Sequence, residues 1–145
     1  MWVKKENVQA AINIMKRNRK YGQKLDMSEW QDSGLHKIQN TESGVWFCDC
    51  VCSMGGYIAV SSEFYANGDG GDAGPWGNPV LNGLGGTYAI AEWFGISEAD
   101  AEALTCDRGH EKIAQYRGKK VSDITFGDVI EVLEILRETG SIYSD

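Results

Sequence analysis

The chain has 145 residues, a formal net charge of −7, 42% hydrophobic residues and 24% charged residues. These values fit one globular domain over residues 1–145 and exclude a disordered or fibrous protein. No apolar run reaches the roughly 18–20 residues of a membrane span. Because the chain is acidic and its N-terminal residues lack the apolar core of a signal peptide, we expect a cytoplasmic protein with no membrane partner and no direct nucleic-acid contact.

The charge is divided unevenly along the chain. Residues 1–37 carry 8 basic and 4 acidic side chains, whereas residues 38–107 carry 10 acidic side chains and neither Lys nor Arg. Residues 108–145 are close to neutral, with 6 basic and 7 acidic side chains. Two interpretations stay open for the cation-free stretch. It forms either a solvated surface that keeps the protein soluble, or an acidic face that docks on a basic protein surface or imitates a nucleic-acid backbone.

The first predicted element is a helix over residues 4–20. Apolar residues recur there with helical spacing, from Val8 to Met15, and Gly22 follows as a C-terminal cap. A basic cluster occupies the last turn, where cations oppose the negative end of the helix dipole. A phosphate-binding patch is the alternative interpretation of this cluster, which consists of Lys16, Arg17, Arg19 and Lys20.

The middle of the chain mixes short elements with glycine-rich sequence. A short hairpin fits residues 38–48, and a helix is predicted from Met54 to about Ser62 with Ser53 as its N-cap. Residues 64–86 hold 8 of the 18 glycines and both prolines, without a periodic pattern. We therefore expect one long Gly-rich loop there, and loops of this length tend to be functional or mobile.

Helical patterns return in the last third of the chain. The clearest covers residues 126–139, where Thr125 and Asp128 fit a capping box and Gly140 ends the helix. Since little alternating strand pattern separates these segments, the sequence predicts a mainly α fold in a small single domain. The three shorter helices predicted before the last one are 87–94, closed by Gly95, then 97–104, capped by Ser97, and 110–117.

Three cysteines at alternate positions, Cys48, Cys50 and Cys52, form the most distinctive motif. Together with Cys106 and His110 they supply enough ligands for a zinc site, for which we take Cys48, Cys52, Cys106 and His110 as candidates. Their spacing differs from the usual paired C-x(2–4)-C pattern. Reduced cysteines that pack as small hydrophobic side chains are the favoured alternative, and no other cofactor is expected.

The start of the helix after this motif offers two further hypotheses. Cys52 precedes a helix N-terminus, where the dipole lowers a thiol pKa, but only His36 and His110 are available as a base. Ser53, Gly55 and Gly56 leave backbone N–H groups for a small anionic ligand such as a nucleotide or phosphate. Alternatively, the glycines let neighbouring elements pack closely. Because no set of nucleophile, base and orienting group is visible, the sequence leans away from an enzyme.

The Gly-rich segment carries candidate partner contacts. Asp69 and Asp72 lie in a stretch that superficially suggests a calcium loop, but Asn78 stands where an EF-hand requires its bidentate Glu. Trp76 either anchors the segment on the core or contacts a partner. We take Asp69, Asp72, Trp76 and Glu92 as candidate partner-binding residues of the cation-free stretch.

Four segments in order resemble a loose family of short, uncharacterised bacterial and phage proteins. They are LDMSEW (25–30), CDCVCSMGG (48–56), FGISEADAEAL (94–104) and DVIEVLEILRETG (128–140). Cys48, Met54, Gly55 and Gly56 fall on the family's C-G-T-x-x-C-I-G/A-G motif, whereas Asp49 and Cys50 replace its Gly-Thr. The resemblance implies a cytoplasmic single domain and a mobile-element origin, and it supplies no activity, substrate or cofactor.

These observations favour a small acidic binding protein. The first hypothesis is a phage accessory or counter-defence factor that engages a host protein through its acidic face. The alternatives are a binder of small anionic ligands at Ser53–Gly56 and a zinc-stabilised domain.

Overall fold

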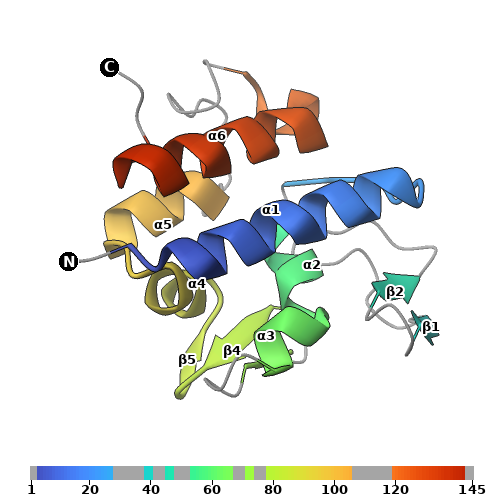
Figure 1. Ribbon diagram of the computed structural model, residues 1–145, viewed down its shortest axis with the longest axis horizontal. Helices are drawn as coiled ribbons and strands as arrows, with labels where there is room; N and C mark the ends of the chain where they lie inside the picture. Colours follow the sequence, from blue (N-terminus) through green and yellow to red (C-terminus); the bar gives the residue numbers. More distant parts are fainter. Residues whose placement is uncertain are drawn as a thin grey trace.

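The computed structural model describes residues 3–27, 38–40, 45–47, 53–66, 71–73, 78–105 and 119–142. Within these ranges, helices and short strands surround one hydrophobic core, which confirms the predicted mainly α fold (Figure 1). The helices are α1 (Lys5–Lys20), α2 (Met54–Ala59), α3 (Ser62–Ala66), α4 (Thr87–Phe94), α5 (Glu98–Thr105) and α6 (Phe126–Thr139). The strands are β1 (Ile38–Asn40), β2 (Val45–Phe47), β3 (Asp72–Ala73), β4 (Pro79–Leu81) and β5 (Leu84–Gly85).

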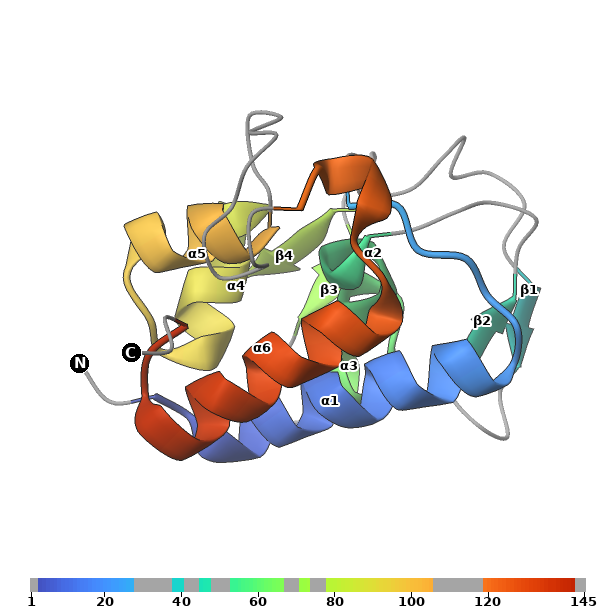
Figure 2. The same ribbon diagram turned by 90° about the horizontal axis from the view of Figure 1, so that it is seen from above.

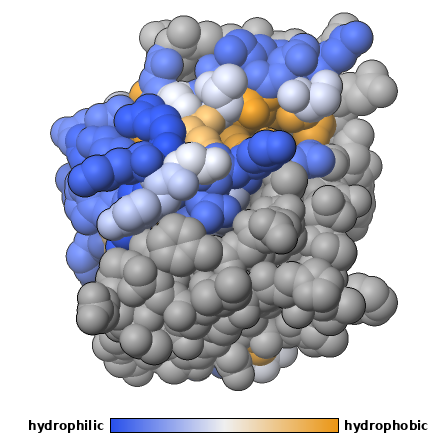
Figure 3. All heavy atoms as spheres, turned by 90° about the vertical axis from the view of Figure 1, so that its right-hand side faces the viewer, coloured by the Kyte–Doolittle hydropathy of each residue, from blue (hydrophilic) through white to orange (hydrophobic). Residues whose placement is uncertain are grey.

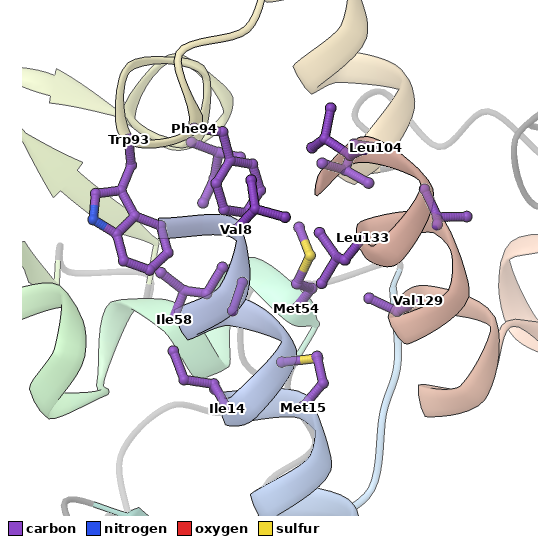
Figure 4. Close-up of a cluster of buried hydrophobic side chains, with 14 of the residues drawn as sticks. Val8, Ile14, Met15, Met54, Ile58, Trp93, Phe94, Leu104, Val129 and Leu133 are labelled. Atoms are coloured by element: carbon purple, nitrogen blue, oxygen red, sulfur yellow. The ribbon is translucent and has the colours of Figure 1, made fainter. Parts of the chain in front are cut away.

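The two longest helices, α1 and α6, lie antiparallel and side by side (Figures 1 and 2). The predicted apolar stripe of α1, including Val8 and Met15, is fully buried, and Leu133 of α6 is fully buried as well. Figure 4 shows Met54 of α2 between these two helices, close to Leu133. The apolar sides of α1 and α6 are buried against each other, and this contact joins the first and the last helix of the chain.

Helix α4 closes the core on the side of the α1 N-terminus. Its Trp93 ring packs edge-on against Phe64 at 5.3 Å between centroids and is stacked on Phe94 at 5.5 Å. The backbone N–H of Lys4 donates to Phe94 O at 2.8 Å, and Asn7 Nδ2 donates to Trp93 O at 2.8 Å. These bonds satisfy carbonyls at the end of α4 and fix the helix against the start of α1.

Most predicted helix ends agree with the structure, but the helix predicted from Met54 to about Ser62 already ends at Ala59, and a separate helix begins at Ser62. Ser53 Oγ accepts from Gly56 N at 3.3 Å, and Ser97 Oγ accepts from Asp100 N at 3.2 Å. Gly95 and Gly140 adopt left-handed backbone conformations after α4 and α6. The hairpin predicted at 38–48 is present as the antiparallel pair β1–β2. The helix predicted at 110–117 lies outside the described residues.

The expectation of one unbroken loop over residues 64–86 is wrong. The described part of this segment contains an antiparallel sheet in the order β3–β4–β5. Its second hairpin has a two-residue turn at Asn82 and Gly83, whose φ angles of 51° and 78° are both positive. Asn-Gly favours this turn because both residues tolerate positive φ, so Leu81 and Leu84 can pair directly across it.

Candidate protein-binding surface

The buried start of α2 does not have the geometry of an open anion site. Every residue from Ser53 to Val60 is buried. The N–H groups of Met54 and Gly56 are already hydrogen-bonded, the first to Met27 Sδ at 3.5 Å and the second to Ser53 Oγ. Gly55 and Gly56 are thus buried with the rest of the helix start, and the anion-binding hypothesis for Ser53–Gly56 stays a prediction.

Arg17 is the member of the basic cluster at the end of α1 that forms an ion pair with a described residue. Arg17 makes a bidentate ion pair with Glu63 of α3, with Nη1 and Nη2 at 2.8 and 2.9 Å from the two carboxylate oxygens. This pair ties the last turn of α1 to α3 across 46 positions of sequence. It also neutralises one of the ten acidic residues of the cation-free stretch.

Helices α4 and α5 each carry one exposed carboxylate, on Glu92 and Glu98. The apolar side of α4, with Ala89, Ile90, Trp93 and Phe94, is buried, so the helical spacing leaves Tyr88 and Glu92 on the opposite, exposed side. Glu98 begins α5 and is exposed, and Asp100, two residues later in the first turn, is half-buried. Glu92, Glu98 and Asp100 form no ion pair with any residue that the structure describes.

Two large apolar side chains accompany these carboxylates. Tyr88 is 46% exposed on α4, and Leu84 is 39% exposed on β5, which packs beside α4. We call Leu84, Tyr88, Glu92, Glu98 and Asp100 the acidic surface. Carboxylates beside an exposed aromatic ring are typical of surfaces that contact basic protein partners, because the ring supplies contact area and the charges supply orientation.

The acidic surface is built on a rigid support. A pair of buried hydroxyls, Thr87 Oγ1 and Thr105 Oγ1, lie 3.1 Å apart and join α4 to α5. Because Thr105 Oγ1 donates to Ala101 O at 2.8 Å, the Thr87 hydroxyl is the donor of the pair. Fixed helices hold their exposed side chains in place, which reduces the entropy lost on binding.

The structure locates part of the predicted partner-binding set. Glu92 is exposed on α4, as a contact residue requires. Asp72 lies on β3, paired with Val80, while Asp69 and Trp76 lie outside the described residues. Leu84 and Tyr88 were missed, because the sequence does not show which side of α4 faces the core until the packing of α1 and β4 is known.

The predicted thiol and histidine chemistry concerns other parts of the chain. Cys48, Cys50, Cys52, Cys106, His36 and His110 all lie outside the described residues. Among the residues that the structure does describe, no group of three His, Cys, Asp or Glu side chains has the arrangement of a metal site. The zinc hypothesis therefore stays a prediction.

Among the described residues, Asp128 is the titratable group whose pKa is shifted, and its surroundings are structural. Asp128 is desolvated by burial, which raises its pKa, but hydrogen bonds from Lys119 and from Thr125 outweigh this effect. The net pKa of Asp128 is therefore lower than its ordinary value. Since its carboxylate belongs to the capping box of α6, the shift reports on helix stability rather than on catalysis.

No protein-family model, curated protein or solved structure matches the chain. Within the described ranges, no helix combines the length and apolar character needed to cross a membrane.

Proposed function

We propose that the protein is a non-enzymatic binding module that engages a basic surface on another protein through its acidic surface. The observation that carries this proposal is the pairing of exposed Tyr88 with Glu92 one turn later on α4, beside the acidic start of α5. The uneven distribution of charge along the sequence supports the proposal. No Lys or Arg occurs from residue 38 to residue 107, so the carboxylates of this stretch have no cationic neighbours in the sequence.

The resemblance noted above agrees with this proposal without specifying a partner. A phage accessory or counter-defence factor that contacts a host protein would fit it, and an acidic surface complements a host protein whose own surface is basic. The partner is therefore expected to present Lys and Arg, with an apolar pocket for the Tyr88 ring.

Differential capture from bacterial lysate tests the proposal. The immobilised full-length protein is compared with the variant Tyr88→Ala/Glu92→Lys, and bound proteins are quantified by mass spectrometry. We expect a basic protein that is retained at least tenfold better by the wild type and that elutes as NaCl rises, because salt screens exposed charges. Glu138→Lys is the matched control, since Glu138 is exposed near the end of α6. Equal capture by all three proteins contradicts the proposal.

A further inference from the structure

A second surface lies at the opposite end of the molecule, where α1 ends. Figure 3 looks onto this end and shows an apolar strip bordered by hydrophilic side chains. The strip lies between the segment that follows α1 and the short 3-10 helix Val121–Asp123 that precedes α6. Leu25 and Val121 are the partly buried apolar residues of these two segments, and both pack against the core.

Exposed cations border the strip on the α1 side. Arg19, Lys20 and Lys24 are all exposed, and none of their side chains is hydrogen-bonded or ion-paired to a described residue. On the other border, Lys119 is engaged by Asp128 at 2.8 Å, while Lys120 and Asp123 are exposed and of opposite charge. The strip therefore has one clearly basic border and one border that is close to neutral.

Capping of α1 does not account for these cations. The carbonyl oxygens of Arg17, Asn18 and Arg19 already accept backbone N–H groups from the next turn, at 3.0–3.1 Å. The helix dipole corresponds to only about half a negative charge. Arg19, Lys20 and Lys24 therefore leave a positive surface at this end of α1, which an anionic partner surface can complement.

The backbone beneath the strip is held in place. Tyr57 donates its hydroxyl proton to Lys24 O, and its ring lies 5.8 Å from that of Phe126 at the start of α6. Met27 anchors the next residues through its sulfur, which accepts from Met54 N at 3.5 Å. The basic border and the apolar strip thus keep a fixed relation to each other, which is a requirement for recognising a partner with a defined pattern.

We propose that this strip binds an acidic amphipathic helix of a partner protein, with its apolar side on Leu25 and Val121 and its carboxylates toward Arg19, Lys20 and Lys24. An apolar stripe flanked by acidic residues complements a strip with a cationic border. A phosphate backbone uses the cations alone and leaves the strip uncovered, so an acidic helix is the better fit.

Panning of peptide libraries tests this surface directly. Three libraries of helical peptides share one apolar stripe and carry acidic, neutral polar or basic flanks. Full-length protein is expected to enrich the acidic library, and fluorescence anisotropy then gives the Kd of the best peptide. Enrichment of the neutral or basic library, or of none, overturns the proposal. Tighter binding of a labelled oligonucleotide than of the peptide also overturns it.

Variants distinguish this surface from the acidic surface. Lys20→Glu/Lys24→Glu is expected to weaken peptide binding about tenfold, because two exposed attractions become repulsions. Val121→Ala is expected to weaken it about fivefold through lost apolar contact. Lys4→Glu/Lys5→Glu is the charge-matched control at the other end of α1, where acidic residues suit the helix dipole. Equal affinities across these variants refute the proposed site, and circular dichroism verifies that each variant is folded.

Discussion

Gly71 and Phe64 illustrate how closely single residues are fitted around the aromatic cluster. Gly71 N donates to Phe64 O at 3.2 Å, and the fully buried Phe64 ring packs against Trp93. A Cβ atom at position 71 would lie 2.4 Å from Phe64 Cδ2, which is far inside van der Waals contact.

A pair of Gly→Ala variants tests this close approach. Gly71→Ala is expected to lower the free energy of unfolding by about 1–3 kcal/mol, because the Phe64 ring must leave its preferred position. Gly85→Ala is the control, since its Cβ would meet Asn78 Nδ2 at an ordinary 3.5 Å. It should change stability by less than about 0.5 kcal/mol. Urea unfolding followed by circular dichroism measures both, and equal effects would refute the packing argument.

At the scale of elements, α6 begins with a capping box reinforced by a lysine. Thr125 Oγ1 accepts from Asp128 N at 3.2 Å, and Asp128 Oδ2 accepts from Thr125 N at 3.0 Å. Lys119 Nζ contacts both oxygens of the same carboxylate, at 2.8 and 3.0 Å. One side chain therefore satisfies a backbone donor of the helix start and fixes the segment before it.

Stability should depend on pH through Asp128. Its folded-state pKa is lowered, so its stabilising contribution is complete above the ordinary carboxyl pKa and is lost as pH falls below that value. Asp128→Asn should reduce the unfolding free energy by about 1 kcal/mol near neutral pH. The difference between wild type and variant should shrink toward zero under acid conditions. Chemical unfolding at a series of pH values measures it, and a constant difference would contradict the assignment.

The sequence predicted those elements whose signals are local. The caps at Ser53, Ser97 and Thr125 involve contacts three residues apart, so residue type alone indicates them. The Asn82–Gly83 pair is itself a local signal for a hairpin turn. Its strands, however, are too short to show an alternation of apolar and polar residues, and the glycines around them are typical of a loop. The structure corrects this interpretation because pairing with neighbouring strands stabilises segments that no pattern reveals.

Long-range features could not be predicted in the same way. Arg17 and Glu63 are 46 residues apart, so only the packing of α1 on α3 shows that they pair. Exposure of Tyr88 likewise depends on which side of α4 meets the core. Of the four candidate partner-binding residues, Glu92 is the one whose side chain the structure describes, and it is exposed.

At the scale of the whole molecule, charge is arranged along the direction of α1. Helices α4 and α5 lie near its N-terminal end, whereas Arg19, Lys20 and Lys24 lie in or just after its last turn (Figures 1 and 2). The two proposed surfaces are therefore separated by the body of the core. Since exposed charges are screened over about 8–10 Å at physiological salt, each surface can act without disturbing the other.

The packing of α1 against α6 between these two ends should determine overall stability. Leu133→Ala is expected to lower the unfolding free energy by about 2–5 kcal/mol, because Leu133 is fully buried and its loss leaves a cavity between helices. Ile135→Ala, two residues further on the same helix, removes a side chain that is only partly buried. It should cost about 1 kcal/mol or less. Thermal unfolding should show the difference as roughly 2–4 °C per kcal/mol for a chain of this size. Similar losses for both variants would mean that the α1–α6 contact is not the centre of the cooperative core.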